Sequence, residues 1–385
     1  MLRRTLKWAG LVLALFLLVL AGLVAAAWAP DRPVDSLKAR WAPAPSQFVR
    51  IEAMDVHLRD EGPRDDPLPI VLIHGTSASL HTWDGWAGAL KPTRRVIRFD
   101  LPAFGLTGPA PDGDYTLARY ARFVTQVLDH LQVKQAVLAG NSLGGGIAWK
   151  TAVDFPARVA ALVLVDASGY PITALSVPIG FRIARVPALA PLMQNVLPRR
   201  LIEASARNVY GDPSRVTPEL VDRYYELTLR EGNRQALVQR FREIQREDLS
   251  AQIAQVRQPT LILWGSRDRL IPPEQAGRFH EDIAGSQLTM FDGLGHVPQE
   301  EDPAATVAAV KAFLARQRWA CGRPARSRQR DAAGREGLVQ RAQAAVEQGR
   351  GDLALQHLEH RLHVVDEPVR GRGGRLRPSA RHRVE

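Results

Sequence analysis

A short apolar strand that runs into a Gly-x-Ser-x-Gly turn is the feature that most constrains how this chain folds. Residues 137–139 are apolar and lead into Gly140-Asn-Ser-Leu-Gly144, and two further glycines follow before a helix-like segment. A serine on so sharp a strand-to-helix turn exposes its Oγ, and only small residues fit at the flanking positions. The N-terminus of the following helix favours negative charge at that oxygen. The turn predicts that Ser142 is a nucleophile, the alternative being a glycine-rich turn with an inert serine.

Strand and helix patterns alternate along most of the chain. After a predicted hairpin at residues 48–59, strand patterns occupy residues 69–73, 95–99, 161–165, 260–264 and 287–291. Helical periodicity lies between them and is clearest at residues 116–131. Strands that alternate with helices predict an α/β protein with a mostly parallel, right-handed wound sheet.

Residues 170–250 interrupt this alternation with a mostly helical pattern. Prolines at positions 178, 187, 191 and 198 break its apolar first part and exclude a membrane-spanning helix there. An insertion of this kind predicts a helical cap, or lid, over the carboxyl edge of the sheet, where ligands bind in such folds. The core then comprises residues 47–169 and 251–317. We expect the cap either to pack on the sheet domain or to rest an apolar face on a bilayer.

Residues 1–29 have the pattern of a signal anchor or a signal peptide. Three basic residues precede the 21 uncharged residues 8–28, a length that spans a bilayer core of ~30 Å as a helix. The basic flank favours a body beyond the membrane, periplasmic or extracytoplasmic. We expect an uncleaved anchor, because the apolar run exceeds the ~7–15 residues of a signal peptide. Cleavage near Ala27-Trp-Ala29 would instead give a secreted or periplasmic protein. Prolines make residues 30–46 a predicted extended linker.

Basic charge is concentrated in the tail, residues 318–385. This segment holds 15 Arg, no Lys and 8 acidic residues, so +7 of the net charge of +11 lies there. The body is then about +4, which argues against a nucleic-acid-binding protein. We expect a disordered tail, with binding to anionic lipid or nucleic acid as the alternative. Cys321 is the only cysteine, which excludes an intrachain disulfide and suggests no thiolate metal site.

Two later loops supply the partners that a nucleophilic serine needs, a base and a residue that orients it. His296 lies in a glycine-rich loop directly after the last predicted strand, and Asp268 follows the strand before it. Both therefore emerge at the same sheet edge as Ser142, in the Ser, Asp, His order expected of this architecture. We predict that these three residues are catalytic. Asp166, at the end of the strand before the cap, is the alternative to Asp268.

An oxyanion hole needs two backbone N–H groups near the nucleophile. Leu143, the residue after the nucleophile, supplies one, and the loop that begins at His74 supplies the other. We expect the second donor to be Thr76, with Ser77 as the alternative. His74 itself is expected to order this loop and not to act as a base. Asp100 is expected to hold a turn.

Five motifs in this order resemble the motif series of the α/β-hydrolase superfamily, over about residues 48–318. The motifs are His74-Gly75, Asp100-Leu-Pro-Ala-Phe-Gly105, Gly140-Asn-Ser-Leu-Gly-Gly145, Trp264-Gly-Ser-Arg-Asp268-Arg-Leu-Ile-Pro272 and Gly295-His-Val-Pro-Gln-Glu300. The resemblance implies an α/β-hydrolase fold, with a mostly parallel eight-stranded sheet, helices on both faces and an inserted helical cap.

Within the superfamily the chain is similar to capped esterases and lipases and to the carbon–carbon bond hydrolases of meta-cleavage pathways. The elbow, with Asn141 and its run of glycines, resembles the latter. Their Gly-Ser-Gly-Pro-Gly oxyanion loop is replaced by Gly75-Thr-Ser-Ala-Ser79, and the Trp after their catalytic His is replaced by Val297. Haloalkane dehalogenases and epoxide hydrolases are similar in the placement of the cap but use Asp as nucleophile, so Ser142 argues against those reactions.

These patterns together predict a serine hydrolase that cleaves carboxylic esters through an acyl-enzyme, with no cofactor and no metal. The expected partners are a small-molecule ester, including lipid-like esters, and a membrane contacted through residues 8–28 and the cap; no nucleic-acid partner is expected. A C–C bond hydrolase of vinylogous 1,5-diketones is the alternative. A non-catalytic binding protein of the same fold is a second alternative, although such proteins typically lack a member of the triad.

Overall fold

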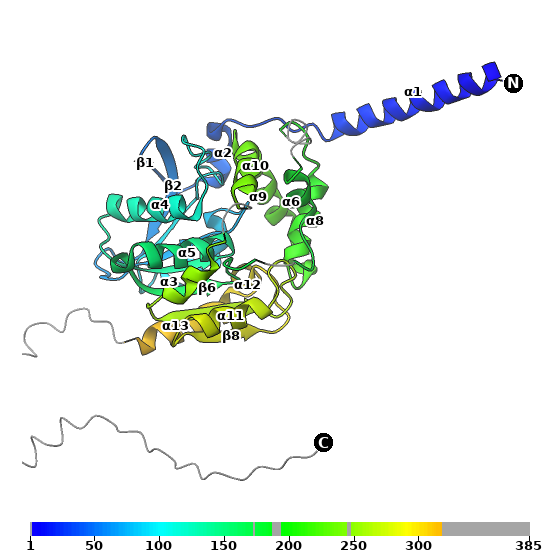
Figure 1. The fold of residues 1–385 in the computed structure, drawn as a ribbon. Helices are drawn as coiled ribbons and strands as arrows, with labels where there is room; N and C mark the ends of the chain where they lie inside the picture. Colours follow the sequence, from blue (N-terminus) through cyan, green and yellow to red (C-terminus); the bar gives the residue numbers. More distant parts are fainter. Residues whose placement is uncertain (1, 172–173, 187–193, 245–247, 318–385) are drawn as a thin grey trace, which may run out of the picture. The chain divides into compact units, whose positions relative to one another are not determined.

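The structure, a computed structural model, describes residues 2–171, 174–186, 194–244 and 248–317 (Figure 1). Its central sheet has the strand order β1-β2-β4-β3-β5-β6-β7-β8. The pairs β1–β2 and β2–β4 are antiparallel, and the other neighbours are parallel. The strands are β1 (Gln47–Ile51), β2 (Met54–Glu61), β3 (Ile70–Ile73), β4 (Val96–Phe99), β5 (Ala136–Asn141), β6 (Val159–Val165), β7 (Thr260–Gly265) and β8 (Gln287–Phe291). The predicted mostly parallel, eight-stranded sheet is confirmed.

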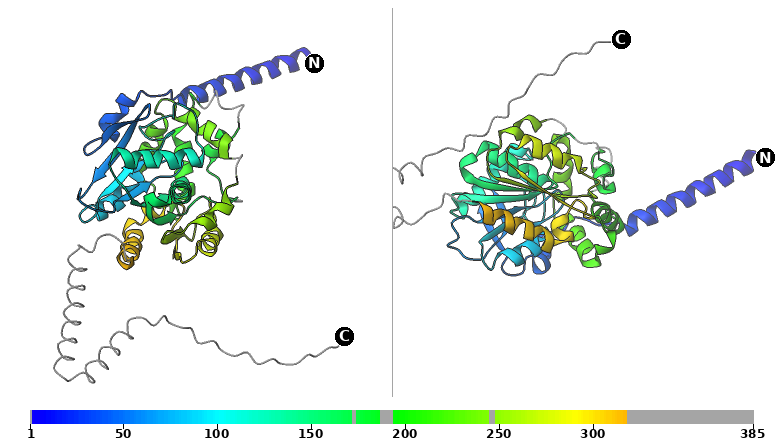
Figure 2. Two further views of the ribbon diagram at one scale, coloured as in Figure 1. Left: turned by 60° about the vertical axis from the view of Figure 1, so that its left-hand side comes forward. Right: turned by 90° about the horizontal axis from the view of Figure 1, so that it is seen from below.

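Helices cover both faces of the sheet (Figure 2). On one face, α3 (Asp84–Leu90) packs against α13 (Pro303–Arg316), next to the short α12 (Pro298–Glu301). The other face is covered by α4 (Leu117–His130), α5 (Leu143–Asp154) and α11 (Glu274–Asp282). The inner strands of the sheet are therefore buried between two helical layers, whereas the edge strands β1 and β8 are partly exposed.

The alternation of side chains along β3 shows how both faces are filled. Val71 and Ile73 belong to the large apolar cluster that includes side chains of α4 and α5. Ile70 and Leu72, which point to the opposite face, are equally buried but lie outside that cluster. A strand buried on both faces needs apolar residues at every position, which explains the continuous apolar run in the sequence.

The described part of the segment between β6 and β7, the cap, contains the helices α6 (Ile179–Ala184), α8 (Arg199–Val209), α9 (Pro218–Thr228) and α10 (Asn233–Ile244) (Figure 1). α8 contacts both α6 and α9, and α10 contacts α6. Local side chains set where these helices begin. At α9, Thr217 Oγ1 caps the helix by accepting from the N–H of Leu220 at 3.2 Å, and a proline occupies the first turn.

α1 (Leu2–Ala26) contains most of the uncharged N-terminal run. Among the described residues, Trp8–Ala26 is the one helical segment long and apolar enough to cross a membrane, and none of it is buried in the protein. A signal sequence near the N-terminus can satisfy the same criteria of length and hydropathy, so both expectations for residues 1–29 stand. The predictions for residues 318–385 concern a segment outside the described residues.

The predicted extended linker is wrong for part of residues 30–46, because Val34–Trp41 form helix α2. Leu37 of this helix is only 1% exposed and packs with Leu106 and with Leu227 of the cap. Trp41 Nε1 donates to Glu226 Oε2 on α9 at 2.6 Å. Prolines favour an extended chain in isolation, but burial of an apolar side chain against the folded domain outweighs that preference.

We call residues 27–46 the strap, because they join the end of α1 to the cap and to the core. Ala29 N–H donates to Asn195 O at 2.8 Å, and Leu197 N–H donates to Ala27 O at 3.0 Å. The end of the membrane-type helix is thus paired with the cap segment that precedes α8.

Candidate active site

Ser142 lies at the turn between β5 and α5, as the sequence predicts. Its backbone angles, φ 56° and ψ −117°, are rarely adopted by residues with a side chain, and such strain costs roughly 1–3 kcal/mol. Two hydrogen bonds hold the turn: Ser142 N–H donates to Val165 O at 3.0 Å, and Ser142 O accepts from Ser168 N–H at 2.9 Å. The surrounding backbone therefore imposes the conformation that presents Oγ.

Two glycines make this turn sterically feasible. A Cβ on Gly140 would lie 2.1 Å from Gly144 O, and a Cβ on Gly144 would lie 2.1 Å from Ile73 O. These are contacts with backbone, which cannot move aside as a flexible side chain can. β3, β5 and α5 consequently approach one another at the nucleophile as closely as their backbones allow.

His296 and Asp268, the residues predicted to be base and orienting carboxylate, are in hydrogen-bond contact. His296 Nδ1 lies 2.7 Å from Asp268 Oδ2, and both side chains are buried. The other oxygen, Oδ1, accepts from the N–H groups of Leu270 at 2.8 Å and Ile271 at 3.0 Å. The carboxylate is therefore fixed by backbone, and the hydrogen-bond pattern assigns the imidazole proton to Nδ1, which leaves Nε2 to accept a proton.

Ser142 and His296 line the same pocket. Among the described residues no hydrogen bond joins Ser142 Oγ to the imidazole. Hydrogen bonds between catalytic groups are often long in the free enzyme and tighten when substrate binds. The arrangement brings nucleophile, base and orienting group together from three separate strand ends.

Asp166, the alternative to Asp268, also lies close to His296 and Asp268. One oxygen of each of the two carboxylates and a ring nitrogen of His296 lie within 4.8 Å of one another. Asp166 Oδ1 accepts from Gly265 N–H at 3.0 Å. Complete burial, together with the charge of Asp268, raises the pKa of Asp166 well above its usual value. This shift favours the protonated form of Asp166, and Asp268 is the carboxylate in contact with His296 Nδ1, so Asp268 is better placed to stabilise an imidazolium.

The same three groups are the place where a metal ion would find ligands in the described part of the chain. Ligation through His296 Nδ1 would require that nitrogen to lose both its proton and its bond to Asp268. The hydrogen bonds already present favour a proton-transfer site over a metal site.

The donors expected for the oxyanion hole lie beside the nucleophile. Thr76 and Ser77 line the pocket together with Ser142, and Leu143 begins α5 directly after it. In the described residues the N–H groups of Thr76, Ser77 and Leu143 donate to no protein acceptor. Thr76 therefore stays a prediction, with Ser77 as its alternative, and the Leu143 N–H is free at a helix N-terminus.

Asn141 connects the nucleophile strand to the loop of the base, a role that sequence reasoning missed. Its Nδ2 donates to His296 O at 2.9 Å and to Val165 O at 3.2 Å. Glu301, also missed, accepts from Gly295 N–H at 2.7 Å and from Gly211 N–H at 2.9 Å. The signal for Asn141 was a polar residue at the end of an apolar strand, because a buried amide needs partners.

His74 orders the loop beside the nucleophile, as expected. Its Nδ1 lies 2.8 Å from Gly75 O, and its Nε2 accepts from Leu101 N–H at 2.9 Å. Both nitrogens are thus occupied. Complete burial lowers the pKa of His74 and keeps the imidazole neutral.

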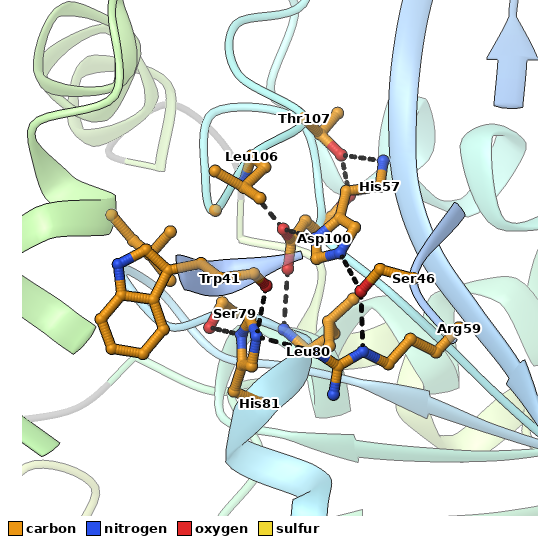
Figure 3. A network of polar contacts seen from close by, with 12 residues as sticks. Trp41, Ser46, His57, Arg59, Ser79, Leu80, His81, Asp100, Leu106 and Thr107 are labelled. Atoms are coloured by element: carbon orange, nitrogen blue, oxygen red, sulfur yellow. Dashed lines mark hydrogen bonds and ion pairs between the residues drawn. The ribbon is translucent and has the colours of Figure 1, made fainter. Parts of the chain in front are cut away.

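Asp100 forms a second histidine–carboxylate pair (Figure 3). Its Oδ2 lies 2.7 Å from His57 Nδ1, and Oδ1 accepts from Leu80 N–H at 2.8 Å. Burial alone raises the pKa of Asp100, but the adjacent His57 holds it below its usual range. His57 Nε2 in turn lies 2.9 Å from Ser46 Oγ, to which Arg59 Nε donates at 2.9 Å. Because Ser46 lies on the strap and not in the pocket of Ser142, this array fixes the strap to the core.

Residues 69–303, more than half of the 385-residue chain, match the family described as having the alpha/beta hydrolase fold. The chain belongs to the α/β-hydrolase family. The 2-hydroxymuconate semialdehyde hydrolase of Pseudomonas putida is 32% identical to this α/β hydrolase over 270 residues, which cover 67% of this chain and 90% of that protein. The predicted superfamily is confirmed.

Solved structures extend this comparison. A meta-cleavage product hydrolase from Pseudomonas fluorescens IP01 superposes with a TM-score of 0.60 at 25% identity, covering 70% of this α/β hydrolase and 96% of that chain. A membrane phospholipase A has the same fold, with a TM-score of 0.61 at 24% identity over 81% of this chain and 98% of its own. The α/β hydrolase is therefore similar in fold to enzymes of different substrate classes.

Substituting Asp268 and Asp166 in separate variants tests which of the two is the acid of the triad. We expect Asp268→Asn to lower kcat by about 10³- to 10⁴-fold, because an amide cannot stabilise the imidazolium or fix its tautomer. We expect Asp166→Asn to lower kcat no more than about tenfold, because Asp268 and not Asp166 is hydrogen-bonded to His296. Release of p-nitrophenol from p-nitrophenyl butyrate measures both, with thermal unfolding as the folding control. A larger loss in Asp166→Asn would exchange the two roles.

Proposed function

We propose that this α/β hydrolase cleaves carboxylic esters by a Ser142 acyl-enzyme mechanism. The observation that carries the proposal is one pocket lined by both Ser142 and His296, with the Asp268 carboxylate 2.7 Å behind the imidazole. Apolar side chains dominate the rest of the lining and include Leu197, Leu201, Ile202 and Leu237 from the cap. An apolar wall next to a few polar groups suits an ester with a hydrocarbon chain.

In this mechanism His296 Nε2 takes the proton of Ser142 Oγ as the oxygen attacks the ester carbonyl carbon. The N–H groups of Leu143 and Thr76 donate to the oxyanion that forms. The imidazolium, stabilised by Asp268, then gives its proton to the departing alcohol. Water, deprotonated by His296, attacks the acyl-enzyme, releases the carboxylic acid and restores the serine.

C–C bond hydrolysis of a vinylogous 1,5-diketone is the second candidate. It is favoured by similarity to the 2-hydroxymuconate semialdehyde hydrolase of Pseudomonas putida and by the Gly140-Asn-Ser-Leu-Gly-Gly145 elbow. The Gly75-Thr-Ser-Ala-Ser79 loop and Val297, where the sequence departs from the pattern of those enzymes, favour the ester.

A fluorophosphonate probe and a substrate panel test the proposal. We expect the probe to label Ser142, and Ser142→Ala to lose both the label and the burst of p-nitrophenol, because Ser142 is the pocket serine that the strand-to-helix turn presents at the start of α5. The control, Ser46→Ala, removes the serine of the second Ser-His-Asp array and should keep the label. In the panel, kcat/KM should be higher for p-nitrophenyl esters than for a vinylogous 1,5-diketone. Full turnover by Ser142→Ala would refute the mechanism, and cleavage of the diketone alone would establish the second candidate.

Attachment to a membrane is part of the same proposal, with the catalytic body beyond the membrane. It is supported by the apolar segment Trp8–Ala26 and by large apolar side chains exposed in the first part of the cap. Leu175 is 71% exposed, and Ile179 and Val186 are also exposed. Such side chains next to an anchor favour lipid-like esters as substrates.

Alkaline carbonate extraction tests the attachment. We expect the full-length protein to stay in the membrane pellet, because a spanning helix is not released when peripheral proteins are removed. The N-terminus of the mature protein, read by mass spectrometry, should begin before Trp8. A soluble protein that begins near residue 30 would show instead that residues 1–29 are a cleaved signal peptide.

A further inference from the structure

Arg234, near the start of α10, has an unpaired N–H group for which the proposed ester hydrolysis gives no role. Its side chain is only 3% exposed and lines the same pocket as Ser142 and His296. Nε donates to Asp31 Oδ1 at 3.1 Å, and Nη2 donates to the same oxygen at 2.5 Å. Nη1 is buried and has no acceptor among the described residues. A buried guanidinium N–H without a partner is unfavourable. A ligand that accepts a hydrogen bond from this group would therefore gain binding free energy.

Among the described residues, no second arginine or lysine side chain lines this pocket. No aspartate or glutamate among these residues lines it either. Arg223, which also belongs to the cap, is already paired with Glu300. Asp31 offsets part of the charge of Arg234, but in surroundings of low polarity a guanidinium edge without an acceptor still attracts an anion more strongly than it would in water.

Asp31 explains why only one edge of the guanidinium is free. It belongs to the strap, and one of its oxygens accepts from Nε and Nη2 of Arg234 while the other accepts from Gly232 N–H at 3.0 Å. This hold fixes the guanidinium plane, since two of its nitrogens are tied to one carboxylate. The segment that follows α1 therefore positions a side chain of the substrate pocket.

We propose that Arg234 Nη1 binds an anionic oxygen of the substrate, so that the enzyme selects esters that carry a carboxylate or a phosphate. The inference rests on the proposed function and names the substrate class of that site. In this class, the ester carbonyl lies at Ser142, the hydrocarbon portion lies against Leu197 and Leu237, and the anion binds Arg234. Asp31 is a positioning residue, because it acts through the guanidinium.

Matched pairs of esters test this selection. The first pair is mono-p-nitrophenyl adipate and the neutral p-nitrophenyl hexanoate; the second is dioctanoylphosphatidylglycerol and dioctanoylglycerol. We expect Arg234→Gln to lower the ratio of kcat/KM for the anionic ester to that for the neutral one by about 10- to 100-fold in at least one pair, mainly through KM. Loss in the first pair alone identifies a carboxylate, and loss in the second alone identifies a lipid phosphate.

Three further variants make the result specific. Arg242→Gln removes an exposed arginine of the same helix and should leave both ratios unchanged. Arg234→Lys keeps the charge and should recover part of the preference, and Asp31→Ala, which removes the acceptor of Nε and Nη2, should give an intermediate loss because the guanidinium is no longer held. Equal ratios in Arg234→Gln and Arg242→Gln, with wild type active on the neutral esters, would overturn the anion site and leave the proposed function intact.

A binding measurement covers the case in which no ester is turned over. Adipate or inorganic phosphate should raise the Tm of the wild type and of Arg242→Gln, but not of Arg234→Gln. Equal shifts in all three proteins would overturn the anion site independently of catalysis. A protein that hydrolyses none of the esters yet shows the Arg234-dependent shift would refute the proposed function alone.

Discussion

The close approach of three backbone segments at Gly140 and Gly144 is the constraint on which the rest of the site depends. A methyl group at either position would lie 2.1 Å from a carbonyl oxygen of a neighbouring segment. Because β3, β5 and α5 meet there, Ser142 is held at φ 56°, a conformation that it would not choose alone. The strain is balanced by the packing of the sheet and its helices, so the fold itself, without a ligand, sets the position of the Ser142 side chain.

Much of this site was readable from the sequence because its parts follow strands. Asp268 and His296 each lie just beyond an apolar run, and in a parallel sheet the ends of such runs share one edge. The elbow was readable because a serine between glycines after a strand has few structural uses. The sequence favoured Asp268 but left Asp166 as the alternative, since both satisfy the same rule. The folded structure adds that the hydrogen bond to His296 Nδ1 comes from Asp268.

The strap and its contacts could not be predicted, for a different physical reason. Proline content indicated an extended linker, but Leu37 finds an apolar site built from Leu106 and Leu227, far away in the sequence. The bond between Asp31 and Arg234 joins residues 203 positions apart, and neither residue stands in a periodic pattern. Pairings of this kind are decided by tertiary packing alone, and local sequence carries no signal for them.

These contacts give the molecule a continuous physical connection from its N-terminal helix to its substrate pocket. The end of α1 pairs with the segment before α8, and Leu197 of that segment lines the pocket. The strap then supplies Asp31 to a pocket arginine and Ser46 to the buried network around Asp100. The cap is therefore held between the core and the strap, and the pocket wall depends on both.

The most direct test of the proposed site is the structure of the full-length protein after reaction with a fluorophosphonate. We expect phosphorus bonded to Ser142 Oγ, with the phosphoryl oxygen about 2.7–3.1 Å from the backbone nitrogens of Leu143 and Thr76. His296 should keep its bond to Asp268 in that adduct. Phosphorus on another residue, or a phosphoryl oxygen that points away from both N–H groups, would contradict the central claim that the elbow and its neighbouring loops form a serine-hydrolase site.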